Sequence, residues 1–268
     1  MDLRKYKRVF TFGCSFTNYF YPTWANIAHV SMPHAQHINL GKSGGGNMFI
    51  SNRITQANNT YEFCDTDLVM VMWSTLCRED RFHHNNWNTP GNIFTQDEYD
   101  DKFLRKYADP TGYLIRDLSI IDLTTMYMST LSCDYFDMLS VPFDYQCIDP
   151  EESLYKDVLN TYSNLIDHFD KTTLLDYLGE FNGKLTYEVI MNSKPSERVD
   201  YHPHPVQYCD YLQHIKFPLT DESIHYAQES YDKALLIKTE SDYYKVFSDL
   251  TDSYTKNTQW SIQQMKDV

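Results

Sequence analysis

A short apolar segment at residues 9–12 leads directly into the turn sequence Gly-Cys-Ser-Phe-Thr at residues 13–17. The β-branched and aromatic side chains of the segment favour a buried strand, and Gly13 permits a sharp turn that a Cβ atom would oppose. Ser15 is therefore expected at the carboxyl end of a strand, the edge at which open α/β sheets bind their ligands. Taken by itself, the same pattern also fits an ordinary turn or a helix N-cap.

Strand and helix signals alternate along the chain, which is the pattern of a parallel sheet covered by helices. The segments that we expect to be strands are residues 9–12, 37–40, 67–73 and 135–141. Residues 24–30 are expected to be helical or irregular, and residues 48–56, 113–131 and most of 151–178 have helical character. Between them, the polar residues 78–109 predict a long excursion over the active edge of the sheet. We therefore predict an α/β fold with a doubly wound parallel sheet in residues 1–216 and a helical C-terminal extension in residues 217–268.

The charge and hydropathy of the chain exclude several classes of function. The 268 residues include 23 basic and 37 acidic side chains, which give a net charge of −14. A nucleic-acid-binding protein needs a broad positive face, so nucleic acid is not an expected partner. No apolar stretch approaches the roughly 18 residues of a membrane-spanning helix, and the N-terminus lacks the apolar core of a signal peptide. The six cysteines show no C-x-x-C spacing, which favours reduced thiols in a cytoplasmic protein.

Acyl transfer requires a nucleophile, a base, a group that orients the base, and donors for the oxyanion. Ser15 is the candidate nucleophile. The sequence Asp-Tyr-His-Pro-His-Pro at residues 200–205 offers His202 as the base and Asp200, two residues earlier in a proline-restrained loop, as the orienting acid. The backbone N–H groups of Ser15 and Gly44 are candidate oxyanion donors, because Gly44 belongs to a glycine-rich loop after the second expected strand.

These segments resemble the conserved sequence blocks of the SGNH (GDSL-like) hydrolases. Residues 13–17 resemble block I with a Cys in place of the usual Asp, residues 39–44 resemble the N-x-G-x-x-G pattern of block II, and residues 200–203 resemble block V. The resemblance spans residues 9 to 215, with its blocks in the family's order. It implies a flavodoxin-like three-layer α/β/α sandwich and a triad of Ser15, His202 and Asp200 that hydrolyses esters or acetyl groups without a metal or organic cofactor.

Two departures from the family pattern concern the oxyanion hole and the base. Block III usually ends its strand with G-x-N-D, and its Asn side chain is a third oxyanion donor, whereas this chain has Trp-Ser-Thr-Leu-Cys-Arg at residues 73–78. Ser74, Thr75 and Asn47 are the candidates to replace that donor. The second departure is D-x-H in place of D-x-x-H in block V. Both variants resemble a divergent, phage-type branch of the family, so the chain is expected to be cytoplasmic, either cellular or virus-encoded.

Structural roles compete with the catalytic ones at several of these positions. His204 is an alternative base, and Asp200, His202 and His204 together would form a metal site if that segment were extended. Asn47 also fits the N-cap of the helix that follows it. Ser74 also fits an ordinary hydrogen bond at a strand end.

Candidate substrate contacts follow the third expected strand. Arg78 fits either a contact with a substrate anion or a structural ion pair, and Trp73 is a candidate substrate contact. His83, His84 and Trp87 fit either a surface loop or the lining of the substrate pocket.

We therefore expect a serine hydrolase that acts on a small-molecule or glycan ester. Two other functions stay open: a degenerate member of the fold that serves as a binding or virion-structural protein, and an acyltransferase that uses the same triad. Labelling by a fluorophosphonate distinguishes the enzyme from the binding protein. Product analysis with alcohol or amine acceptors distinguishes the hydrolase from the transferase.

Overall fold

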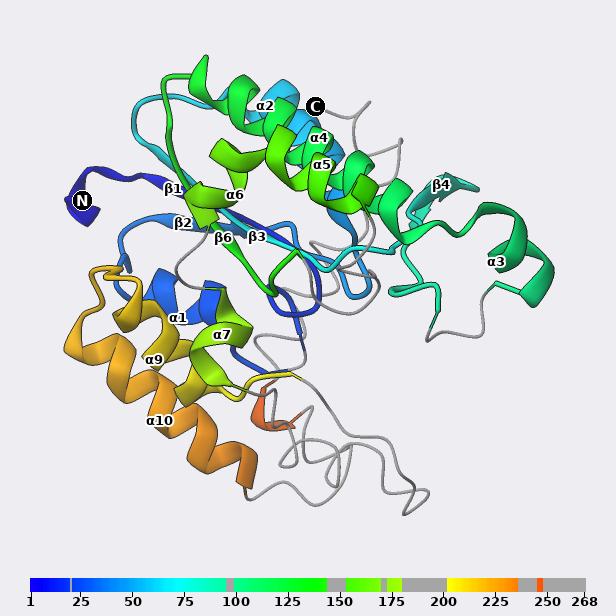
Figure 1. The fold of residues 1–268 in the computed structure, drawn as a ribbon. Coiled ribbons are helices and arrows are strands. Elements are labelled where there is room, and N and C mark those ends of the chain that lie inside the picture. The colour runs from blue at the N-terminus through cyan, green and yellow to red at the C-terminus, as the bar shows by residue number, and fades with distance from the viewer. Residues whose placement is uncertain are drawn as a thin grey trace.

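The computed structural model describes residues 1–19, 21–94, 99–143, 153–169, 173–179, 202–235 and 245–247. Its central feature is a four-stranded parallel sheet (Figure 1). The strands lie in the order β2 (Gln36–Asn39), β1 (Arg8–Phe12), β3 (Asp67–Trp73) and β6 (Asp134–Leu139). The chain thus enters the middle of the sheet, extends it to one edge and then builds the other side, which is the flavodoxin-like order.

Strand β3 lies inside the sheet, and all seven of its residues are buried. Its side chains alternate between two core clusters, one on each face of the sheet. Val69, Val71 and Trp73 belong to one cluster, and Leu68, Met70 and Met72 belong to the other. A strand that is apolar on both faces is what a parallel sheet between two helical layers requires.

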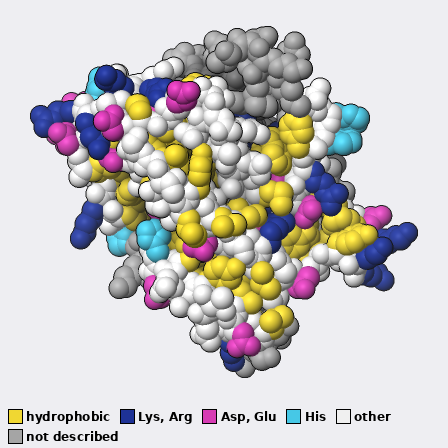
Figure 2. Space-filling model, turned by 90° about the horizontal axis from the view of Figure 1, so that it is seen from above, with side chains coloured by type: hydrophobic (Ala, Val, Ile, Leu, Met, Phe, Trp, Pro, Cys, Tyr) yellow, Lys and Arg dark blue, Asp and Glu magenta, His cyan; other side chains and the backbone are white. Residues whose placement is uncertain are grey.

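Helices cover both faces of this sheet (Figure 1). One layer contains α2 (Asn47–Tyr61), α4 (Pro110–Ser129), α5 (Ser153–Thr161) and α6 (Ser163–Phe169). The other layer contains α1 (Trp24–Val30), α7 (Leu174–Leu178), α9 (Pro205–His214) and α10 (Asp221–Leu235). A single 3-10 turn, η1 (Leu3–Lys5), precedes β1. Seen from the side of the first layer, hydrophobic side chains form a broken band, with most Lys and Arg side chains near the edges of the view (Figure 2).

The excursion after β3 contains a hairpin and a short helix. Strands β4 (Arg81–His83) and β5 (Asn86–Asn88) pair antiparallel, and helix α3 (Asp101–Tyr107) follows them. His84 and Asn85, at the tip of the hairpin, have φ angles of 48° and 62°. Positive φ at both central residues is the property of a two-residue type I′ turn. The hairpin and α3 project together from one end of the sheet (Figure 1).

The strand order and the two helical layers confirm the predicted three-layer fold class. The bounds predicted for α1 and β3 are those observed. The predicted N-cap of α2 is wrong, because Gly46 is the N-cap and Asn47 is the first helical residue. The carboxylate of Asp80 accepts the backbone N–H groups of Gly46 and Phe49, both at 2.9 Å, so a distant side chain satisfies the helix start. The predicted helical segment 151–178 contains three short helices, α5, α6 and α7.

Part of the predicted C-terminal extension lies in the core of the domain. Helix α10 packs against α1 and α9, and its buried alanines belong to the same core cluster as one face of the sheet. Ser31 Oγ and Ser223 Oγ lie 2.6 Å apart across this contact. The boundary at residue 216 stays a prediction. Among the described helices, none combines the length and apolarity that crossing a membrane demands.

Candidate active site

Ser15 and His202 form a close pair at the carboxyl edge of the sheet. Ser15 follows β1, and His202 lies three residues before the first residue of α9. Ser15 Oγ and His202 Nε2 are 2.7 Å apart, within the range of a hydrogen bond between a nucleophile and its base. Ser15 is only 8% exposed, so substrate must reach a largely covered hydroxyl. The structure therefore brings together two residues that are separated by 187 positions in the sequence.

The turn that presents Ser15 depends on Gly13. This glycine has a φ of 157°, and a Cβ atom on it would lie 2.0 Å from Thr17 Oγ1 and 2.9 Å from the carbonyl oxygen of Met72. The N–H of Thr17 donates to the carbonyl of Cys14 at 3.0 Å, which closes the turn around the serine. Any larger residue at position 13 would displace the turn and with it the serine hydroxyl.

Aromatic residues that follow the serine hold the imidazole of His202. The ring of Tyr19 stacks on it, with centroids 3.8 Å apart and planes 13° from parallel. Phe16 meets it edge to face at 5.2 Å. The hydroxyl of the buried Tyr21 lies 3.2 Å from the carbonyl oxygen of His202 and 3.1 Å from that of Pro203. The sequence interpretation missed these three residues, although their aromatic character immediately after the serine is a signal that could have found them.

His204 has a structural role that separates it from His202. It is the N-cap of α9, and its Nδ1 accepts the backbone N–H of Gln207 at 3.3 Å. Burial lowers the pKa of His204 to about 4, so the ring is neutral and can accept this bond. Asp200 lies outside the described residues. Within the described residues, no three His, Cys, Asp or Glu side chains converge as ligands for one metal ion.

The glycine loop at residues 41–46 is clamped by the hairpin. Lys42 Nζ donates to the carbonyl of Trp87 at 2.5 Å, and Thr89 Oγ1 donates to the carbonyl of Ser43 at 2.8 Å. Gly44 has a φ of 73°, and a Cβ atom on it would lie 2.0 Å from the carbonyl oxygen of Thr89. Only glycine fits at position 44, because both the backbone conformation and the close approach of the hairpin exclude a side chain.

Three polar groups at this edge are not used inside the described protein. The backbone N–H groups of Ser15 and Gly44 donate to no acceptor among the described residues. The hydroxyl of Ser74, which follows β3, is buried and also has no hydrogen-bond partner there. Because these groups follow strands at the carboxyl edge of the sheet, where such sheets bind ligands, they are candidates for contacts with a ligand.

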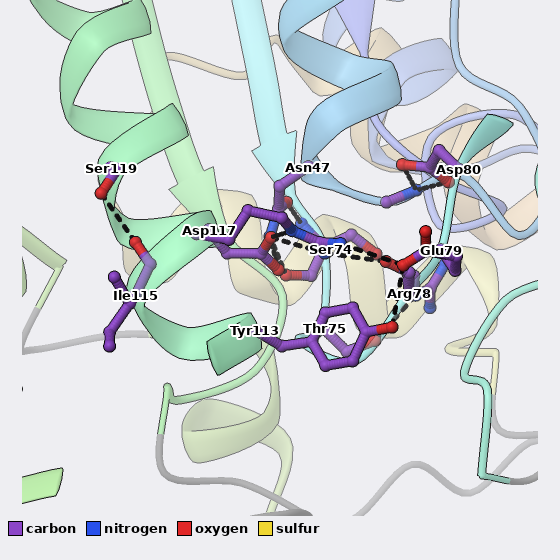
Figure 3. Close-up of polar contacts among 12 residues, drawn as sticks. Asn47, Ser74, Thr75, Arg78, Glu79, Asp80, Tyr113, Ile115, Asp117 and Ser119 are labelled. Atoms are coloured by element: carbon purple, nitrogen blue, oxygen red, sulfur yellow. Dashed lines mark hydrogen bonds and ion pairs between the residues drawn. The ribbon is translucent and has the colours of Figure 1, made fainter. Parts of the chain in front are cut away.

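The side-chain amide of Asn47 makes hydrogen bonds to Ser74 and Asp117, which Figure 3 shows. Its Oδ1 accepts the N–H of Ser74 at 2.8 Å, and its Nδ2 donates to the carbonyl of Ser74 and to Asp117 Oδ2, both at 3.2 Å. Burial raises the pKa of Asp117 to about 6, against the opposing effect of Arg116. Both amide protons of Asn47 are thereby used to hold the end of β3, and neither is left for an oxyanion.

Arg78 links the segment after β3 to the glycine loop through hydrogen bonds. Its Nε donates to Thr75 Oγ1 at 2.8 Å and its Nη1 donates to the carbonyl of Gly45 at 3.0 Å. These contacts use Arg78 as a hydrogen-bond donor to the protein itself. Trp73 is fully buried in the core cluster under α2 and α4, and its surface is not available to a substrate in this conformation. His83 and His84 are exposed on the hairpin.

The fold and this edge define the class of the protein: a doubly wound α/β/α protein with a serine–histidine pair at the edge where such sheets bind ligands. Comparisons with solved structures found three similar proteins. The chain is similar to a member of the lipolytic G-D-S-L family from Veillonella parvula, with 14% identity, a TM-score of 0.41, and coverage of 79% of this chain and 99% of that one. It is also similar to LAE5, an alpha/beta hydrolase enzyme from the metagenome of Lake Arreo, with 13% identity, a TM-score of 0.31, and coverage of 95% and 97%.

A protein from Bacillus subtilis aligns with 63% of this chain and 42% of its own, at 9% identity and a TM-score of 0.34. No protein-family model matches the sequence, and no curated protein matches it. Because all three TM-scores lie below 0.5, the assignment of the fold depends on the strand order and helical layers of this chain.

Proposed function

We propose that the protein is a serine hydrolase of the SGNH (GDSL-like) type that cleaves an ester or O-acyl bond. The observation that carries the proposal is the 2.7 Å contact between Ser15 Oγ and His202 Nε2 at the carboxyl edge of the sheet. The sequence blocks around both residues support it. In this proposal Asp200 orients the imidazole through Nδ1, and the N–H groups of Ser15 and Gly44 together with the hydroxyl of Ser74 bind the oxyanion.

The reaction proceeds in two halves on these groups. His202 Nε2 takes the proton of Ser15 Oγ while the oxygen attacks the acyl carbon, and the carbonyl oxygen becomes the oxyanion. As the tetrahedral intermediate collapses, the bond to the alcohol breaks and His202 returns the proton to the leaving oxygen. A water molecule then attacks the acyl-serine with the same base, which releases the carboxylic acid and restores Ser15.

The direct test is covalent labelling by a fluorophosphonate and turnover of p-nitrophenyl acetate. We expect Ser15→Ala to abolish labelling and to lower kcat by at least about 10⁴-fold, and His202→Asn to do nearly the same. Ser129→Ala, which changes an exposed serine at the end of α4, is the matched control and should leave both signals unchanged. A folded wild-type protein that neither labels nor turns over any ester would contradict the proposal and favour a binding protein.

Two further experiments distinguish the proposed mechanism from related ones. Product analysis in the presence of alcohol or amine acceptors shows whether water or the acceptor takes the acyl group, which separates hydrolase from acyltransferase. Activity in the presence of a chelator should be unchanged for the serine mechanism, because Ser15 is activated by His202 rather than by a metal ion.

A further inference from the structure

Asp117 in α4 has a fully buried carboxylate next to the end of β3 (Figure 3). Its Oδ2 accepts a hydrogen bond from Asn47 Nδ2 at 3.2 Å. Its Oδ1 accepts one from Arg116 Nε at 2.8 Å, and Arg116 Nη2 lies 2.7 Å from the same oxygen. Arg116 Nη2 also donates to the carbonyl of Arg78, in the segment after β3, at 2.7 Å. A buried charge is stable when it is paired and hydrogen-bonded, and the carboxylate of Asp117 meets both conditions.

The charge of Asp117 favours one of the two orientations that the amide of Asn47 can take. In the observed orientation, Asn47 Oδ1 accepts the N–H of Ser74 at 2.8 Å and Nδ2 donates to the carbonyl of Ser74 at 3.2 Å. A carboxylate can only accept, so it must face Nδ2 and not Oδ1. A flipped amide would place two donors together at the N–H of Ser74 and would bring Oδ1 against both the carbonyl and the carboxylate. The contact with Asp117 therefore stabilises the orientation that holds both backbone groups of Ser74.

The strand register places Ser74 beside the nucleophile. Phe12 in β1 pairs with Val71 in β3, and Ser15 and Ser74 each come three residues after this pair. A Cβ atom on the glycine of the nucleophile turn would lie 2.9 Å from the carbonyl oxygen of Met72, so the turn packs directly on the end of β3. Because adjacent strands lie only about 4.8 Å apart, the end of β3 and the nucleophile turn are neighbours at the carboxyl edge.

We propose that Asp117 is a positioning residue for the oxyanion hole: its carboxylate sets the amide of Asn47, and that amide sets the backbone, and with it the hydroxyl, of Ser74. The proposal rests on the function proposed above and adds to it a residue that acts through others. An oxyanion donor is effective when it is held about 2.7 to 3.1 Å from the oxyanion before the reaction begins. A misplacement of about 1 Å can remove most of that benefit.

A double-mutant cycle with Ser74→Ala tests this coupling. The assays are run at about pH 8, above the pKa of about 6 to which burial raises Asp117, so that its carboxylate is ionised. Asp117→Asn keeps the shape of the side chain but turns an amide N–H toward the donors of either Asn47 or Arg116. In the wild-type background it should lower kcat for p-nitrophenyl acetate at least about tenfold, with KM nearly unchanged. In the Ser74→Ala background it should lower kcat less than about twofold, because the donor that it positions is already absent.

Asp67→Asn is the matched control. Asp67 is also a fully buried carboxylate that pairs with an arginine, Arg8, at 2.6 Å, but it is the first residue of β3, at the opposite end of the strand from Ser74. Its substitution should lower the thermal unfolding midpoint and leave kcat within about twofold of wild type in both backgrounds. If Asp117→Asn does not give a cooperative thermal transition, Asn47→Ala replaces it in the cycle and should show the same loss of effect in the Ser74→Ala background.

The outcomes separate this proposal from the function on which it rests. Equal effects of Asp117→Asn on kcat in the two backgrounds, or no effect in the wild-type background, overturn the positioning role. A wild-type kcat for Ser74→Ala overturns it as well, since no donor is then left to be positioned. In each of these cases, labelling of Ser15 by a fluorophosphonate leaves the serine hydrolase standing. Absence of both labelling and turnover in the wild-type protein overturns both proposals.

Discussion

Ser74 and Asn47 are two of the candidates for the third oxyanion donor, and their contacts give them different tasks. Asn47 holds both backbone groups of Ser74 with one amide, at 2.8 Å and 3.2 Å, which fixes the position of the strand end. The hydroxyl of Ser74 is buried and unused within the described residues. A positioned hydroxyl can donate to an oxyanion in the same way as an amide, so Ser74 is the better candidate of the two for the third donor of the proposed oxyanion hole.

The first prediction concerns this hydroxyl. Ser74→Ala should lower kcat about 10²-fold to 10³-fold with KM nearly unchanged, because the lost bond forms only in the transition state. The free energy of unfolding should change little, since the hydroxyl has no partner among the described residues. Ser140→Ala is the control: its hydroxyl is also buried and has no partner in the described part of the chain, but it follows β6 instead of β3. Equal effects of the two substitutions on kcat would contradict the assignment.

At the scale of elements, the β4–β5 hairpin and the glycine loop act as one unit. The carbonyl of Trp87 in the hairpin accepts Lys42 Nζ, and the hydroxyl of Thr89, directly after β5, donates to the carbonyl of Ser43. The ring of Trp87 lies 5.6 Å from that of Phe49 in α2. These contacts fix the direction of the N–H of Gly44, which cannot be held by its own side chain. The hairpin is thus a positioning element for the proposed oxyanion hole.

The second prediction tests that coupling. Thr89→Val removes the bond to the carbonyl of Ser43 while keeping the shape of the side chain, and kcat should fall about tenfold because one oxyanion donor is less well placed. Thr89→Ser restores the donor and should recover most of the wild-type kcat. A merely structural role would lower stability in both variants without separating them in kcat. Thermal unfolding measured beside the kinetics distinguishes the two cases.

The sequence predicted the elements whose signal is local and missed the contacts that depend on distant residues. Strand β3 has seven consecutive buried residues, so its bounds are visible in the sequence. The predicted start of α2 is wrong because the side chain that accepts its free N–H groups is Asp80, 34 residues from Gly46. The contact between Tyr21 and the carbonyl of His202 spans 181 residues, so the aromatic residues after the serine mark Tyr21 without naming its partner. The pair of Ser15 and His202 is predicted from two separate motifs, the turn after the first strand and the Asp-Tyr-His-Pro segment, which the family resemblance then links.

At the scale of the whole molecule, two buried ionisable groups in opposite layers respond to pH in opposite directions. His37 in β2 lies against Thr11 and the ring of His29, and burial lowers its pKa to about 3. Asp117 in α4 lies under the other face of the sheet, and burial raises its pKa to about 6. The folded state therefore disfavours the charged form of both groups, one a cation and the other an anion.

The signs of the two contributions follow from linkage. Because the folded pKa of His37 lies below the unfolded value, its contribution to stability is present above about pH 6.5 and is lost as the pH falls toward 3. Because the folded pKa of Asp117 lies above the unfolded value, its contribution is present below about pH 4 and is lost as the pH rises through about 6. Acidification from neutral pH therefore lowers the free energy of unfolding through His37 and raises it through Asp117.

The third prediction follows for urea unfolding measured at about pH 7.5 and about pH 5. Relative to wild type, the unfolding free energy of His37→Gln should rise by about 1 to 2 kcal/mol on acidification, because the wild-type imidazole loses its contribution over this interval and the amide does not. Asp117→Asn should lose about 1 kcal/mol over the same interval. Each variant is the control for the other, since both replace one titrating side chain by an amide. If the unfolding free energies of the two variants shift in the same direction on acidification, His37 and Asp117 are not ionised as this structure requires. The buried network around Asn47 then has a different charge state.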